Sequence, residues 1–118
     1  MSHRIVIRHQ AEVDITDAAV WYQRQQPVDE SGSGLGDAFL AEVDAAISAA
    51  ATNPKRFPRL RRQPEVRRAL TRRFPYRIFF ICRPDAIVII RVLHAARDDR
   101  QWKDQADVAG GKDDSEGQ

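Results

Sequence analysis

The chain has 118 residues, which suits a single domain, and its formal net charge is only +2. No run reaches the ~18 apolar residues that a membrane helix needs, and no basic–apolar–small signal sequence opens the chain. Its one cysteine excludes an internal disulfide. Together these features predict a soluble, cytoplasmic domain.

The small net charge hides an uneven distribution. Residues 1–54 carry a balance of −5, residues 55–103 a balance of +11, and the remaining residues a balance of −4. Arginine supplies most of the positive charge, and arginine suits bidentate contacts to carboxylate or phosphate groups. A solvated face is the alternative explanation for such a block. The pattern favours a surface for an acidic partner, either protein or nucleic acid.

The first 34 residues predict a strand, a helix and a loop. Residues 4–8 form a short β-branched run with an arginine at each end, as expected for an edge strand. Apolar residues then recur at helical spacing over residues 11–25, where Trp21 and Tyr22 are predicted to be packing anchors. The loop over residues 26–34 is rich in Gly, Ser and Pro.

The second helix is predicted from residue 35 to the Asn53-Pro54 stop. The two helices form an antiparallel hairpin in this interpretation, with close approach allowed by small residues such as Ala45, Ala46, Ala49 and Ala50. Residues 54–64 hold three prolines and five basic residues, so no regular element is expected there and an exposed connector is predicted.

Three sequential strands are predicted next, in residues 66–73, 78–82 and 86–90, with the last run continuing toward His94. Pro84-Asp85 supplies turn chemistry between the last two strands, and Cys82 is interpreted as a small core residue. Strict alternation places Arg91 on one face with Ile87, Ile89 and Leu93, and His94 on the other with Val88, Ile90 and Val92. Both faces are apolar, so both are expected to be covered.

The predicted fold class is therefore α+β, with a helical hairpin packed on one face of a mainly antiparallel sheet in the order β-α-α-β-β-β. The domain is expected to span residues 1–105. Residues 106–118 are polar and glycine-rich, which predicts a disordered C-terminal tail.

One set of motifs carries a family resemblance. Arg68, the run 74–78 (FPYRI), a hairpin, the run 92–98 (VLHAARD) and a closing Trp102 occur in this order. Their combination resembles the RelE/ParE superfamily of toxins from type II toxin–antitoxin systems, and most closely its ParE branch. The resemblance implies a toxin that inhibits DNA gyrase and is neutralised by a cognate, ParD-like antitoxin wrapped around it.

The resemblance also implies an alternative, a RelE-like ribosome-dependent mRNA endonuclease. RNA cleavage needs an acid, a base and positive charge near the phosphate. The candidates for that chemistry are His94, Arg97, Arg77, Arg91, Tyr76 and the Arg67/Arg68 pair. The chain has no tyrosine after Tyr76 and few lysines, which favours a non-enzymatic inhibitor. In that interpretation His94 has a structural role, with its side chain hydrogen-bonded at a strand end, and Asp98 forms an ion pair with an arginine. A member that still binds antitoxin but poisons nothing is a third possibility.

The partner-binding candidates are arginines of the basic half and the closing tryptophan, namely Arg61, Arg62, Arg68, Arg72, Arg73, Arg97 and Trp102. No metal site is proposed because His3, His9 and His94 lack ligand spacing with any acid or cysteine. No cofactor is implied, because the glycines at 32, 34 and 36 lack the lysine and the preceding strand of a phosphate-binding loop.

Overall fold

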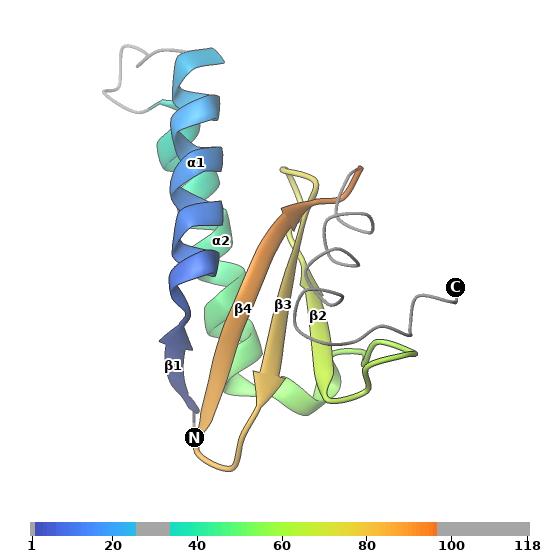
Figure 1. Cartoon of the computed structure of the whole chain (residues 1–118). Helices are drawn as coiled ribbons and strands as arrows, with labels where there is room; N and C mark the ends of the chain where they lie inside the picture. The colour runs from blue at the N-terminus through green and yellow to red at the C-terminus, as the bar shows by residue number, and fades with distance from the viewer. Residues whose placement is uncertain (1, 26–33, 97–118) are drawn as a thin grey trace.

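The computed structural model describes residues 2–25 and 34–96. Its elements follow the predicted order: β1 (Arg4–Ile7), α1 (His9–Gln25), α2 (Leu35–Thr52), the short 3-10 helix η1 (Pro54–Arg56), β2 (Val66–Leu70), β3 (Tyr76–Cys82) and β4 (Ala86–His94). Figure 1 shows the two helices side by side against a single sheet. The predicted α+β fold is confirmed.

The four strands form one mixed sheet in the order β1-β4-β3-β2. β2, β3 and β4 are consecutive antiparallel neighbours, as the hairpin signals predicted. β1 pairs in parallel with the first half of β4, from Arg4 opposite Ala86 to Ile7 opposite Ile89. β1 is thus an edge strand, as predicted, and it leaves the second half of β4 without a strand neighbour on that side (Figure 1).

The helical hairpin is confirmed, and its two helices approach each other closely at Gly36. The backbone N–H of Gly36 donates to Oε1 of Gln23 at 3.1 Å. A Cβ at Gly36 would lie 2.7 Å from the carbonyl oxygen of Ala19, so only glycine allows this approach of α2 to α1. Of the predicted alanines, Ala45 and Ala49 are exposed. Ala50 is buried in the core and Ala46 packs against it, so these two small residues do face inward.

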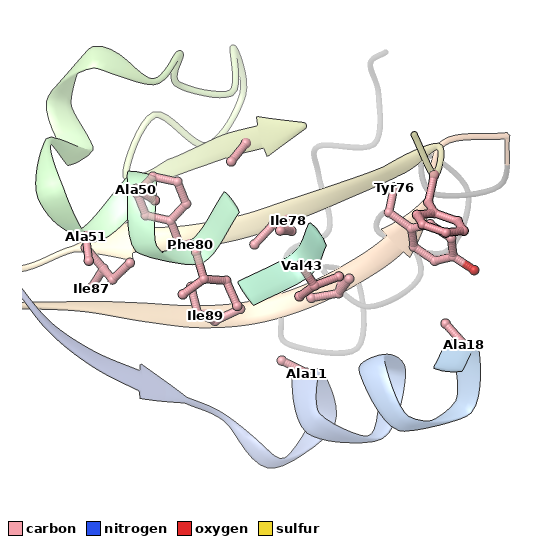
Figure 2. Close-up of a cluster of buried hydrophobic side chains, with 14 of the residues drawn as sticks. Ala11, Ala18, Val43, Ala50, Ala51, Tyr76, Ile78, Phe80, Ile87 and Ile89 are labelled. Atoms are coloured by element: carbon pink, nitrogen blue, oxygen red, sulfur yellow. The ribbon is translucent and has the colours of Figure 1, made fainter. Parts of the chain in front are cut away.

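The main core fills the space between the helices and the sheet, and Figure 2 shows its side chains. Phe39, Ile78, Phe80, Ile87 and Ile89 are all fully buried there. The stripe of α2 and alternate positions of β3 and β4 supply these residues because helix and strand periodicities turn one face of each element inward.

The two aromatic residues predicted as packing anchors behave differently. Tyr22 is packed against the core and contacts the rings of Phe39, Phe74 and Tyr76. Trp21 is 55% exposed, and among the described aromatic rings it meets only Tyr22, in a T-shaped contact. The prediction is wrong for Trp21 because consecutive helical residues lie about 100° apart, so both cannot face the same core.

The opposite face of the sheet is also apolar and buried. Its cluster consists of Val66, Phe79, Val88, Ile90 and Leu93, with exposed fractions of 3–9% in this chain alone. Leu60 of the connector packs against this cluster, and Val6 and Ile81 lie at its edge.

A bulge changes the predicted faces of β4. Phe79 pairs with Arg91 but Phe80 pairs with Ile89, so Ile90 is an extra residue without a partner opposite. After it the alternation moves by one residue: Val92 joins the core under the helices, with Ile87 and Ile89, and Leu93 joins the opposite cluster with Val88 and Ile90. The predicted partition was therefore wrong beyond Ile90.

Three further details differ from the sequence expectation. Residues 54–56 form a turn of 3-10 helix in the connector that was predicted to lack regular structure, and β2 ends at Leu70 and not at residue 73. Cys82 is only half-buried because it is the last residue of β3, so its interpretation as a core residue is wrong.

The predicted 26–34 loop except Gly34, the 106–118 tail, Arg97, Asp98 and Trp102 lie outside the described residues. Within the described ranges, no helix has the length and apolar character that crossing a membrane requires.

Candidate functional site

An apolar groove with a basic rim lies between α2 and the end of β2. Its volume is about 660 Å³. Its apolar lining consists of Ala38, Ala41, Ala45, Ala46, Ala49, Phe57, Ala69 and Leu70. Leu70 is 59% exposed at the end of β2. We call this feature the α2 groove.

The turn after β2 fixes the rim of the α2 groove. The Glu42 carboxylate of α2 accepts the backbone N–H groups of Arg72 and Arg73. The Thr71 hydroxyl accepts the N–H of Tyr76 at 3.0 Å, which closes the turn from the other side. These bonds use the backbone of the turn, so both arginine side chains are exposed at the groove, with Arg73 5.2 Å from the centre of the Phe74 ring.

The other predicted partner-binding arginines lie elsewhere. Arg61 and Arg62 are exposed on the connector before β2 and do not line the α2 groove. Arg68 is half-buried on β2, where its Nε is buried without a hydrogen-bond partner. Of the predicted partner-binding residues that the structure describes, only Arg72 and Arg73 line this groove.

Arg67, the neighbour of Arg68, has a structural role. It is only 9% exposed, and its Nη1 donates to the carbonyl oxygens of Phe57 at 2.8 Å and Lys55 at 3.4 Å. Because this buried guanidinium holds the connector against β2, Arg67 is not placed to contact a phosphate.

A second groove, of about 790 Å³, lies between α1 and the last residues of β4. It is lined by Asp14, Asp17, Ala18, Trp21, Tyr22, Tyr76, Arg91, Val92, Leu93, His94 and Ala96. We call it the α1 groove. It opens beside the half of β4 that β1 does not pair.

A nearly buried ion pair forms the floor of the α1 groove. The Asp14 carboxylate accepts Arg91 Nε at 2.7 Å, Arg91 Nη2 at 3.0 Å and the backbone N–H of Val92 at 2.9 Å. The side chains of Arg91 and Asp14 are 12% and 9% exposed. Asp14 thus takes the place of a strand neighbour where β1 has ended, and it bonds the β4 edge to α1.

Three of the candidate nuclease residues, Tyr76, Arg91 and His94, line the α1 groove together, but each of them also makes contacts within the fold. His94 Nδ1 accepts the N–H of Ala96 at 3.0 Å, so that nitrogen is not available as a base, and the ring meets Tyr76 at 5.2 Å. Tyr76 is buried in the core at 8% exposure, and Arg91 is held by Asp14. Arg77 alternates with Tyr76 along β3 and so lies on the opposite face of the sheet. Arg97 lies outside the described residues.

Sequence reasoning missed Asp14, Glu42 and Trp21. Asp14 and Glu42 looked like ordinary helix carboxylates, since their partners lie 77–78 and 30–31 residues away. Trp21 next to Tyr22 gave a signal, because adjacent helical aromatics cannot both be buried on one face.

Comparison with known proteins agrees with this architecture. The family model for the ParE toxin of the type II toxin–antitoxin system parDE matches residues 5–99. No curated protein sequence matches the chain significantly.

Two solved structures share the fold. A chain of the chromosomal ParDE toxin–antitoxin system from P. aeruginosa is 15% identical, with a TM-score of 0.61 over 79% of this chain and 96% of that one. A chain of the toxin–antitoxin complex RelBE2 from Mycobacterium tuberculosis is 21% identical, with a TM-score of 0.54 over 80% of this chain and 92% of that one.

Proposed function

Because the chain belongs to the ParE toxin family of type II toxin–antitoxin systems, we propose that it inhibits DNA gyrase and is neutralised by a cognate antitoxin. The family match over residues 5–99 is the observation that carries this proposal. The inhibitor acts by binding and not by catalysis. The arrangement of the described candidates supports that view, since Tyr76 is core, Arg91 is paired and Arg77 faces the other way.

The antitoxin contributes an acidic, amphipathic helical segment that lies in the α2 groove. The exposed alanines of α2 allow a helix backbone to approach closely, while Phe57 and Leu70 supply larger apolar contacts. Arg72 and Arg73 then meet carboxylates at the edge of the contact. The whole interface buries at least ~1,000 Å², so further contacts lie beyond the groove, with Arg61, Arg62 and Arg68 as candidates.

Charge reversal at the groove tests this partner. The double substitution Arg72→Glu and Arg73→Glu is expected to slow association with the antitoxin by ~10-fold or more and to flatten its salt dependence. Arg83→Glu is the matched control, because Arg83 is exposed in the turn between β3 and β4 and lines neither groove. Equal association rates for the double variant and the control would contradict the docking of an acidic segment in the α2 groove.

The gyrase contact is proposed around the C-terminal segment, including Arg97 and Trp102. A tryptophan beside arginines has the composition of an interface hot spot. Trp102→Ala is therefore expected to abolish growth arrest in cells that express the toxin without antitoxin, with the far-UV circular dichroism unchanged.

His94→Gln separates the inhibitor from the nuclease. Glutamine keeps a polar side chain but cannot act as a general acid or base, so a binding inhibitor that carries this substitution is expected to keep its toxicity and to induce the DNA-damage response. A RelE-like mRNA endonuclease that used His94 as acid or base would lose ~10²–10⁴ in rate. Loss of toxicity in a folded His94→Gln protein, together with mRNA cleavage by the wild type, would favour the endonuclease.

A further inference from the structure

The α1 groove contains an exposed tryptophan that neither the core nor the antitoxin contact uses. Trp21 is 55% exposed, and its indole makes a T-shaped contact with Tyr22, with ring centres 5.0 Å apart. Tyr22 is itself packed against the core, so its contact restrains the Trp21 side chain. The indole of Trp21 remains open to the groove. A large aromatic surface held in this way is typical of a binding hot spot.

The α1 groove is acidic, although the chain as a whole is basic. Asp14 is neutralised by Arg91, which holds it with two hydrogen bonds. Asp17 also lines the groove, is exposed, and has no ion-pair partner within the described part of the chain. One unneutralised carboxylate therefore remains in the groove.

The positions of Asp17 and Trp21 favour a cationic ligand. They are four residues apart on α1, so a helix brings their side chains to one face. The guanidinium or ammonium group of an arginine or lysine placed between them would form an ion pair with the Asp17 carboxylate. The same group would make a cation–π contact with the Trp21 indole. The apolar lining from Ala18, Val92 and Leu93 suits the methylene stem of such a side chain.

We propose that the α1 groove binds an arginine or lysine side chain of the toxin's target protein, with Trp21 and Asp17 as its two contacts. This proposal rests on the proposed function and adds a second target contact to it. The antitoxin segment does not fit here because its carboxylates would be repelled by Asp17. The α2 groove is a separate feature, because the two grooves share no lining residue. The described chain ends at Ala96 in the α1 groove, directly before the segment proposed for gyrase.

The test compares Trp21→Ala and Asp17→Lys with Val20→Ala in the full chain. Val20 is 44% exposed on the same helix but does not line the groove, which makes it the matched control. Growth arrest, affinity for purified gyrase, affinity for the antitoxin and thermal unfolding are measured for each variant. Both groove variants are expected to lose ~10-fold or more in gyrase affinity and to arrest growth less, as hot-spot residues do. Their antitoxin affinity and unfolding temperature should match those of Val20→Ala.

The readouts separate this proposal from the proposed function. If the wild type arrests growth without binding gyrase, the gyrase assignment fails, and the groove is then judged on growth arrest alone. Wild-type toxicity in both folded groove variants would overturn the groove proposal. A loss in Trp21→Ala with full activity in Asp17→Lys would overturn the cationic ligand. Loss of antitoxin affinity in the folded groove variants would overturn the assignment to the target, and a non-toxic wild type would overturn both proposals.

Discussion

Removing the Asp14 carboxylate should cost this domain a large part of its stability. In Asp14→Ala, Arg91 loses its two side-chain bonds and the backbone N–H of Val92 loses its acceptor. Both ion-pair partners are nearly buried, with side chains 12% and 9% exposed, so water cannot easily replace the missing carboxylate. The substitution removes the carboxylate that pairs with Arg91 and leaves the Val92 N–H without its acceptor.

The expected cost is about 3–5 kcal/mol, the range for breaking a buried ion pair by removal of one partner. The total stability of a small domain is ~5–15 kcal/mol, so the variant loses a large share of it. At about 4 °C per kcal/mol for a domain of this size, the unfolding temperature should fall by roughly 12–20 °C.

A double variant tests the reason for this cost. Asp14→Leu combined with Arg91→Met removes both charges together and should recover ~2 kcal/mol or more relative to Asp14→Ala, because apolar replacement of a buried pair is often neutral. The unsatisfied Val92 N–H keeps the double variant below the wild type by ~1–3 kcal/mol.

Urea unfolding monitored by circular dichroism measures these free energies. Glu12→Ala, which removes an exposed acid from the first turn of α1, is the matched control and should change stability by less than ~0.5 kcal/mol. The reasoning is refuted if Asp14→Ala costs less than ~1 kcal/mol, or if the double variant is no more stable than the single one.

Two further substitutions test the core and the helical hairpin. Ile89→Ala removes a fully buried side chain from the sheet and should cost about 2–5 kcal/mol in denaturant unfolding; a change below ~0.5 kcal/mol would show that the residue is not packed. Gly36→Ala places a methyl group against the Ala19 carbonyl oxygen and should cost ~1–3 kcal/mol by overpacking. Ala is otherwise the better helix former, so a more stable Gly36→Ala protein would mean that the two helices are farther apart.

The order and type of the elements could be predicted because their signals are local. Alternating apolar runs, the Pro84-Asp85 turn and the Asn53-Pro54 stop each act within a few residues. The bulge at Ile90 could not, because it depends on how β3 and β4 pair, and nothing in the run 86–94 distinguishes the extra residue. The parallel partnership of β1 likewise depends on strands that lie about 80 residues apart.

The candidate site was only partly predictable for the same reason. Arginine content identified the basic half, and Arg72 and Arg73 do lie at a groove. Composition could not separate them from Arg67, which looks equally basic but is buried against two carbonyl groups. Nor could it show that Asp14 would hold Arg91, because a helix residue meets a strand 77 residues later only after the fold has formed.

The most direct test of the central claim is a DNA supercoiling assay with purified gyrase and purified toxin, run beside an mRNA cleavage assay in programmed ribosomes. A ParE-type inhibitor is expected to block supercoiling in proportion to its concentration, to be relieved by equimolar antitoxin, and to leave ribosome-bound mRNA intact. Cleaved mRNA with unaffected supercoiling would contradict the account and identify the chain as an endonuclease of the RelE type.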